Sequence, residues 1–239
     1  MTDKENRFEH FDFIQPDPFD WKLERAVHIW KFPVLGGFFS LLTDSEKMIG
    51  ERFRFDGDRN RYITGRRSLR ILLSNYLLLD PMDIRIIAEK GQKPFIENAG
   101  APMRFNISHS GEWVVVALSR DELGIDIEKI DSAFDFSDLL QEHFSPAEQQ
   151  FVATAKIPVA AFYFLWTRKE AVTKAVGFGL RDNLKTVSVL DQFSPHEKHL
   201  KKWMIKSFSF SPDYPVSVAY CSSQPEIGYF DGSHLLSGI

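Results

Sequence analysis

A helix-start signal occurs twice in this chain, once in each half. Thr43 and Ser145 are each followed three residues later by glutamate, the capping-box pattern that satisfies the free N–H groups of a first helical turn. The helix predicted next carries a threonine in both cases: Thr64 lies 21 residues after the first cap, and Thr167 lies 22 residues after the second. This spacing predicts a duplicated unit, and hence an α+β fold of two pseudo-symmetric halves, although identity between the halves is slight and a chance resemblance of two α+β halves explains the spacing nearly as well. A cleft between the halves would receive basic groups from the first half and acidic groups from the second.

Hydrophobic periodicity locates the other elements. We predict helices that start at Thr43 and Ser145 and helices at 60–79 and 160–176. Predicted strands span 27–32, 113–118, 123–128, 186–190, 203–210 and 215–221. The strands at 113–118 and 123–128 are expected to form a hairpin across Ser119–Glu122. The expected organisation is an N-terminal extension at 1–24, halves at 25–104 and 105–225, and a C-terminal tail at 226–239.

Composition excludes several protein classes. The chain has one cysteine among 239 residues, so an intramolecular disulfide scaffold is ruled out. Residues 1–21 lack the order of a signal peptide, and no apolar run approaches the roughly 20 residues of a membrane span. A net charge of −4 argues against broad electrostatic binding of nucleic acid. We expect a cytoplasmic protein without membrane or nucleic-acid partners, and a monomer, since a duplicated chain can close its own cleft.

Two short segments contain acidic residues at informative spacings. In Gly124–Glu128, strand alternation places Asp126 and Glu128 side by side on one face. Glu170 and Lys174 are spaced i,i+4 on one helical face, one turn after Trp166. Taken alone, each pattern also fits a solvated surface, and an exposed Glu–Lys pair contributes only about 0.3 to 0.5 kcal/mol. The tryptophan indicates that the helical face is partly buried, so a charge there needs a partner.

The three carboxylates predict a metal ion if the fold brings them together. Two carboxylates about 4 Å apart repel by about 4 kcal/mol at an effective dielectric of about 20, so three require a cation. Ligands that are all oxygen favour Mg²⁺, or Mn²⁺, over Zn²⁺, and Mg²⁺ commonly shares its coordination shell with substrate phosphate. A phosphorylated ligand would also suit residues 52–70, which hold seven arginines and two acids.

The segment Phe105–Gly111 reads F-N-I-S-H-S-G and is expected to be a polar loop that enters a strand. A hydrolase site is disfavoured because the chain has no G-x-S-x-G elbow and adjacent residues of an extended chain point apart. An ordinary turn and a phosphate-contacting loop stay equal alternatives on the residues alone. Lys47, Lys93 and the arginine-rich segment could add positive charge, although each is individually a typical surface residue.

Taken together, three motifs resemble the surfactin-synthetase-activating type of 4′-phosphopantetheinyl transferase. They are F-N-I-S-H-S-G, G-I-D-I-E and W-T-x-K-E-A-x-x-K, in that order along the chain. The similarity is strong from about Lys93 to Leu180 and looser over most of the remainder. It implies a two-lobed α+β fold with the active site in the cleft between the halves. It also implies transfer of phosphopantetheine from coenzyme A to a serine of an apo acyl or peptidyl carrier protein, with release of adenosine 3′,5′-bisphosphate.

The resemblance implies a role for individual residues. Asp126, Glu128 and Glu170 fall on the magnesium ligands, and Glu170 is also the implied general base. Lys174 matches the lysine that contacts the pyrophosphate and stabilises the leaving group. The residues implied to bind coenzyme A are Lys47, Arg61, Lys93, Pro94, Ser108, His109 and Lys174, of which Ser108 and His109 match the positions that hold the 3′-phosphate.

The sequence departs from the family pattern at two positions on the nucleotide side. Gln92 stands where the pattern has glycine, and Ile49 stands where relatives often have a basic residue. Arg52 or Arg61 would compensate. These departures also fit a non-catalytic protein that binds coenzyme A or a carrier on the same fold, although all three acids and Lys174 are present. A metal-dependent phosphodiesterase fits less well, because the chain lacks the usual histidine and aspartate clusters.

Overall fold

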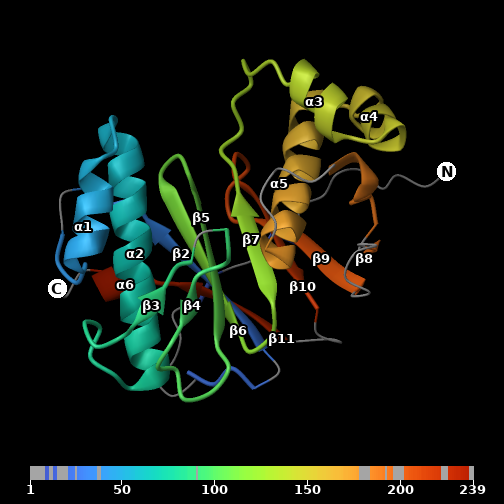
Figure 1. Cartoon of the computed structure of the whole chain (residues 1–239). Coiled ribbons are helices and arrows are strands. Elements are labelled where there is room, and N and C mark those ends of the chain that lie inside the picture. Colours follow the sequence, from blue (N-terminus) through green and yellow to red (C-terminus); the bar gives the residue numbers. More distant parts are fainter. Residues whose placement is uncertain are drawn as a thin grey trace. The chain divides into compact units, whose positions relative to one another are not determined.

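The computed structural model describes residues 9–10, 13–14, 21–24, 26–36, 39–89, 91–177, 184–191, 193–195, 202–221 and 226–236. The fold is α+β, as predicted (Figure 1). The chain forms two compact units: unit 1 contains residues 1–12 and 123–222, and unit 2 contains residues 13–122 and 223–239. Among the described residues, no helix combines the length and apolar character needed to cross a membrane.

Unit 2 is built on a four-stranded sheet with a long helix packed against it. The strand order is β11-β2-β6-β5, and β11 is parallel to β2 whereas the other pairs are antiparallel. Leu69, Leu72 and Leu73 of the long helix pack into the core against Trp30 and Val116 of the sheet. The elements of unit 2 are β2 (Ala26–Pro33), α1 (Asp44–Glu51), α2 (Asp56–Leu77), β3 (Ile86–Ile87), β4 (Phe95–Ile96), β5 (Arg104–Ser110), β6 (Trp113–Ser119), β11 (Glu226–Asp231) and α6 (Ser233–Leu236).

Unit 1 contains the second sheet, in the order β1-β9-β10-β7, with β8 paired to β9. The central pairs β7–β10 and β10–β9 are antiparallel. The helix α5 packs along β7 and β10 (Figure 1). The elements of unit 1 are β1 (Glu9–His10), β7 (Leu123–Ile127), α3 (Ser137–His143), α4 (Pro146–Ala153), α5 (Pro158–Val176), the 3-10 helix η1 (Leu184–Thr186), β8 (Phe193–Pro195), β9 (Lys202–Ser209) and β10 (Pro215–Tyr220).

The two units repeat one arrangement of elements. The strands β2-β6-β5 of unit 2 and β7-β10-β9 of unit 1 pair in the same order, and α1–α2 and α4–α5 occupy the same places in the chain. Both predicted capping boxes are present. In each unit the capping-box glutamate also pairs with a buried cation of the following helix: Glu46 with Arg70 at 2.9 Å, and Glu148 with Lys169 at 3.0 Å. The predicted α+β fold of two similar halves is therefore confirmed.

The predicted hairpin of strands 113–118 and 123–128 is wrong. Both strands exist, as β6 and β7, but β6 pairs with β2 and β5 while β7 pairs with β10 in the other sheet. Residues 120–122 carry the chain from one unit to the other. The hairpin lies one strand earlier, because the segment predicted as a polar loop at 105–111 forms β5 and turns into β6 at Gly111, whose φ of 55° suits glycine.

The strand predicted at 186–190 is also wrong. Leu184–Thr186 forms η1, and the residues that follow are not in a strand. Charged side chains satisfy their backbone instead. The N–H group of Val189 donates to Glu148 at 3.0 Å, and its carbonyl oxygen accepts from Arg168 at 2.6 Å. A segment whose backbone is held by side chains has no need of a neighbouring strand.

The unit boundary differs from the boundary expected at 104/105. It lies between Glu122 and Leu123, because β5 and β6 belong to the sheet of β2. Glu9–His10, within the expected extension 1–24, forms β1 and pairs with β9. Residues 226–236, within the expected tail, form β11 and α6 of unit 2. Both ends of the chain thus contribute described elements to the two units.

Candidate active site

The acidic strand of unit 1 lies directly against α5 because Gly124 has no side chain. A Cβ atom built at Gly124 would lie 2.2 Å from the carbonyl oxygen of Ala171 and 2.3 Å from the amide nitrogen of Ala175. Strand alternation puts Asp126 on the same face, toward α5. Asp126 there accepts a hydrogen bond from the Lys174 ammonium at 2.7 Å, and its side chain is only 4% exposed.

Replacing Gly124 by alanine is therefore expected to destabilise the protein by about 1 to 3 kcal/mol or more, because the new methyl group meets helix backbone that cannot rotate away. Gly57 provides a matched control, since its added Cβ would make only ordinary contacts with the flexible Arg61 side chain. Gly57→Ala lies within α2 and should be neutral or slightly stabilising. Urea unfolding followed by circular dichroism measures both variants, and equal stability of the two would contradict the close packing.

Glu170 is the most perturbed carboxyl group of this face. Its pKa is raised to about 7, mainly by burial and also by the negative charge of Asp126, whereas Lys174 opposes the shift. The carboxyl oxygen Oε1 is buried and accepts no hydrogen bond from any described residue. The side chain can therefore hold or release a proton near neutral pH, which is the property required of a general base.

The raised pKa of Glu170 predicts how the stability of the metal-free protein changes with pH. The unfolded chain releases the proton near the ordinary value of 4.5, whereas the folded chain holds it to about 7. Folding therefore becomes less favourable as pH rises through this window, by about 1 to 3 kcal/mol between about pH 5 and about pH 8. The variant Glu170→Gln lacks this dependence. Urea titrations in EDTA at both pH values measure the difference, and parallel profiles of the two proteins would contradict it.

Glu128 is the third of the predicted metal ligands. It follows the last residue of β7, and its N–H group donates to the carbonyl oxygen of Pro215 at 3.2 Å. Its charge raises the pKa of Tyr163, after the larger effect of burial, so its carboxylate faces α5 near Tyr163. In the described part of the chain, no three acidic, histidine or cysteine side chains are gathered into a metal-binding group.

The pair formed by Asp126 and Glu170 fits a divalent cation. Asp126 and Glu170 repel each other, their donor atoms are carboxylate oxygens, and one Glu170 oxygen is buried without a hydrogen bond among the described residues. In the structure, the Lys174 ammonium contacts Asp126 and partly offsets the negative charge of the two acids. Asp126 and Glu170 are thus close enough to interact electrostatically, and the role of Asp126, Glu128 and Glu170 as metal ligands stays a prediction.

A cavity of about 260 Å³ in unit 2 contains two of the residues predicted to bind the nucleotide end of coenzyme A, Pro94 and His109. Residues of α2, the turn before β4 and β5 form its lining: Tyr62, Gly65, Arg66, Pro94, Phe105, Asn106, Ile107 and His109. Ser108 is buried, and alternation along β5 places it on the face opposite His109. The cavity thus contains one of the two residues matched to the 3′-phosphate.

The three predicted nucleotide-binding cations pair with acids of unit 2. Lys47 contacts Asp44 at 3.1 Å on an exposed surface. Arg61 contacts Asp58 at 2.5 Å and donates to the carbonyl oxygen of Gly111 at 3.3 Å. Lys93 contacts Glu122 at 3.2 Å. None of the three is among the residues that line the cavity of about 260 Å³.

Sequence reasoning missed two sets of residues. Tyr62 and Arg66 line the cavity of about 260 Å³. Their i,i+4 spacing on the helix predicted at 60–79 could have indicated that their side chains are neighbours. Lys169 is fully buried and bonded to Glu148, Leu184 and Val187, although the motif places it beside Glu170 as if it were another site residue. Its partner Glu148 lies 21 residues earlier, and no local pattern reveals such a pair.

Comparisons with known proteins identify the family. Residues 122–219 match the model of the 4′-phosphopantetheinyl transferase superfamily, and residues 34–121 match that of the 4′-phosphopantetheinyl transferase N-terminal domain. The 4′-phosphopantetheinyl transferase ffp of Bacillus subtilis is 31% identical over 73% of this chain and 79% of its own length. The 4′-phosphopantetheinyl transferase Sfp of Bacillus subtilis strain 168 is 29% identical over 79% of this chain and 85% of its own length. The 4′-phosphopantetheinyl transferase HetI of Nostoc sp. is 30% identical over 66% of this chain and 71% of its own length. This chain therefore belongs to the 4′-phosphopantetheinyl transferase family and is an enzyme of that class.

Proposed function

We propose that this enzyme transfers 4′-phosphopantetheine from coenzyme A to a serine of an apo acyl or peptidyl carrier protein and releases adenosine 3′,5′-bisphosphate. The observation that carries the proposal is the group formed by Asp126, Glu170 and Lys174 on adjoining faces of β7 and α5. In this group Glu170 can accept a proton, and it is repelled by the charge of Asp126. The Lys174 ammonium supplies a positive charge beside these two acids. The similarity to Sfp over most of both chains supports the surfactin-synthetase-activating type.

The proposed reaction is a displacement at phosphorus. The serine oxygen bonds to the β-phosphorus of coenzyme A, and the bond from that phosphorus to the oxygen of the adenosine bisphosphate breaks. The serine proton passes to Glu170, whose pKa near 7 suits a base at neutral pH. Lys174 donates to the pyrophosphate and stabilises the negative charge that develops on the leaving group.

A divalent cation completes the proposed site. Asp126, Glu170 and Glu128 would hold Mg²⁺, or Mn²⁺ in its place, and the ion would compensate the charge of the pyrophosphate. Asp126 also positions Lys174 through their 2.7 Å contact. In unit 2, the cavity that contains Pro94 and His109 would hold the nucleotide end of coenzyme A, with Ser108 on the neighbouring strand position. The location of the active site between the halves stays a prediction.

Intact-protein mass spectrometry of a carrier tests the proposed function. The purified enzyme is incubated with coenzyme A, Mg²⁺ and a panel of apo acyl and peptidyl carriers. We expect at least one carrier to gain the mass of one phosphopantetheine group, and EDTA to prevent the gain. Carriers of unchanged mass across the panel would contradict the proposal, and coenzyme A binding that is indifferent to Mg²⁺ would favour a binding protein instead.

A further inference from the structure

We propose that Thr167 is a positioning residue for the transfer reaction, because its hydroxyl group fixes the rotation of α5 that turns Glu170 and Lys174 toward β7. The inference rests on the proposed function and deepens it, since it explains what holds the reacting groups in place. It depends on a chain of hydrogen bonds that leaves α5, crosses two strands of the sheet of unit 1 and returns to α5.

One row of polar side chains crosses the sheet of unit 1 beneath α5. Ser217 of β10 is paired in register with Asp126 of β7 on one side and with Ser207 of β9 on the other. Side chains of residues that lie directly opposite each other on neighbouring strands share one face of the sheet. The contact between Asp126 and Lys174 shows that α5 covers this face. The two serines therefore continue, under the same helix, the row that begins at Asp126.

Hydrogen bonds join this row to α5 at two places. The Arg168 guanidinium donates to the Ser207 hydroxyl at 3.0 Å, and the hydroxyl oxygens of Ser207 and Ser217 are 2.9 Å apart. The Ser217 oxygen is 2.8 Å from that of Thr167, whose hydroxyl donates to the carbonyl oxygen of Phe164 at 3.1 Å. A guanidinium can only donate and a carbonyl can only accept. Each hydroxyl between them therefore donates toward Phe164, and all four bonds have one donor and one acceptor.

Burial makes this chain of hydrogen bonds hard to replace. Thr167 and Ser217 have no exposed surface, and Arg168 is only 4% exposed. Burial lowers the pKa of Arg168 to about 10, so its guanidinium still carries a charge at neutral pH and donates a strong bond at the start of the chain. Removing one buried hydroxyl leaves its neighbour without a partner, and water cannot take its place. A fully satisfied buried network therefore favours one setting of the helix on the sheet.

The place of Thr167 along α5 connects the network to the reacting groups. Glu170 follows Thr167 by three residues and Lys174 follows it by seven, so the three side chains lie on one face of the helix. A rotation of α5 by one residue turns that face by about 100° and separates Thr167 from Ser217. The bond that keeps Thr167 on Ser217 therefore also keeps Glu170 and Lys174 turned toward β7.

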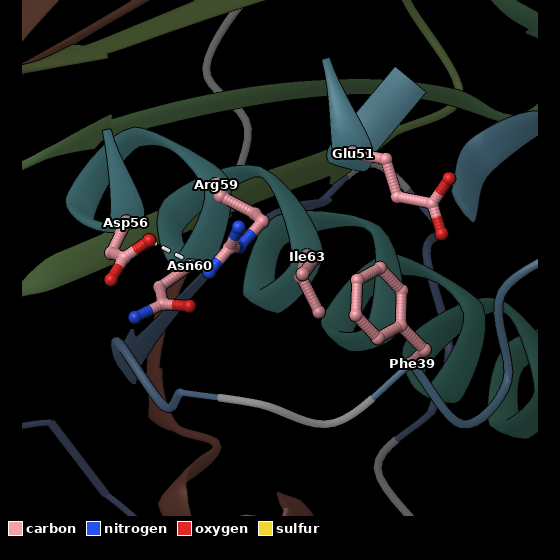
Figure 2. Close-up of a pocket in the computed structure, with 6 residues that line it drawn as sticks. All are labelled: Phe39, Glu51, Asp56, Arg59, Asn60 and Ile63. Atoms are coloured by element: carbon pink, nitrogen blue, oxygen red, sulfur yellow. Dashed lines mark hydrogen bonds and ion pairs between the residues drawn. The ribbon is translucent and has the colours of Figure 1, made fainter. Parts of the chain in front are cut away.

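A helical arginine of unit 2 shows how different the surroundings of Arg168 are. Figure 2 shows the Arg59 guanidinium at a cavity of about 470 Å³, directed to Asp56, which it contacts at 2.7 Å. The Asp56 side chain is 81% exposed, and an exposed ion pair of this kind contributes little to stability. Arg168 instead donates to the carbonyl oxygens of Val189 and Asp191 as well as to the serine that starts the chain. Its bonds hold backbone and hydroxyl groups in place.

Steady-state kinetics of carrier modification tests the assignment, with kcat expressed per folded enzyme. Thr167→Val keeps the shape of threonine without its hydroxyl. It should lower kcat by about 10- to 100-fold, because small displacements of reacting groups are costly, and change the KM for coenzyme A less than about threefold. Thr167→Ser restores the hydroxyl and should keep at least about half of the wild-type kcat. Thr154→Val is the matched control, since Thr154 is exposed and donates to the carbonyl oxygen of Gln150, and it should have the wild-type kcat.

A double-mutant cycle shows whether Thr167 and Ser217 act through the bond they share. Ser217→Ala should also lower kcat by about 10- to 100-fold without a matching change in KM. The double variant Thr167→Val with Ser217→Ala should be within about twofold of the slower single variant, because both substitutions break the same bond. Effects that multiply in the double variant would mean that the two hydroxyls act independently, which contradicts the proposal.

Two further results would overturn the assignment. One is a wild-type kcat in folded Thr167→Val, with folding checked by thermal melting. The other is an equal loss of kcat in Thr167→Val and Thr167→Ser, which would show that the hydroxyl is not what matters. If Thr167→Val does not fold, a wild-type kcat in Ser217→Ala would overturn it instead. The proposed function fails separately, when wild-type protein leaves every carrier unmodified, whereas an enzyme that modifies carriers equally well as Thr167→Val refutes only this inference.

Discussion

Replacing Glu170 by glutamine is expected to lower kcat by about 100- to 10,000-fold and to leave the folded protein as stable as the wild type, or more stable. Activity falls because an amide cannot accept the serine proton. Stability is preserved because the amide has nearly the shape of the carboxylate and removes the charge that Asp126 repels and that burial disfavours. Steady-state kinetics and urea unfolding at about pH 8 measure the two quantities.

An exposed acid of the same unit serves as the control for this variant. Glu142 lies on α3 with 74% of its side chain exposed, so Glu142→Gln should change neither kcat nor stability appreciably. A Glu170→Gln enzyme that keeps more than about half of the wild-type kcat would remove the proposed base. A variant that loses activity and stability together would indicate a structural role for the carboxylate instead.

The second large effect is expected at the fully buried ion pair of unit 1. Replacing Lys169 by methionine should destabilise the protein by about 3 to 5 kcal/mol, because it leaves the Glu148 charge buried without its partner. The change also removes the donor to the carbonyl oxygens of Leu184 and Val187, which Lys169 reaches at 2.8 and 2.7 Å. Urea unfolding measures the loss. Lys156→Met, at an exposed position, is the control and should have little effect.

A double variant separates the buried charge from the lost hydrogen bonds. Glutamine at position 148 carries no charge but has a single carbonyl oxygen. It keeps an acceptor either for Ser145 or for the N–H group of Val189, which bond to different oxygens of Glu148, and removes the buried charge at the cost of about one hydrogen bond. Lys169→Met combined with Glu148→Gln should therefore be more stable than Lys169→Met alone by at least about 1 kcal/mol. A double variant less stable than the single variant would mean that the unpaired charge is not the main cost.

Local sequence signals predicted much of the secondary structure and failed where distant residues decide the pairing. Capping boxes located the starts of α1 and α4, because a cap is made by residues three apart in the chain. The partner of β7 is β10, about ninety residues later, and nothing in the short connection from β6 distinguishes that pairing from a hairpin. The strand expected at 186–190 failed for a related reason, since Glu148 and Arg168 bind that backbone from other elements.

The candidate site was predictable as a set of residues but not as an arrangement. Alternation on β7 placed Asp126 beside Glu128, and i,i+4 spacing on α5 placed Glu170 beside Lys174, but neither local pattern predicted the contact between Asp126 and Lys174. The pairing of Lys47 and Arg61 with nearby acids depends on side-chain positions. Arg66 was counted within a basic segment, and only its place at a cavity distinguishes it from the others.

The central claim is that Asp126 and Glu170 bind a divalent cation together when coenzyme A is present. Electron paramagnetic resonance of Mn²⁺ tests it without turnover, by titrating the ion into the wild-type protein with coenzyme A and into Asp126→Asn and Glu170→Gln. We predict one Mn²⁺ bound by the wild type, and affinity at least about tenfold weaker in each variant, because each loses a charged oxygen ligand. Wild-type affinity in both variants would contradict the claim.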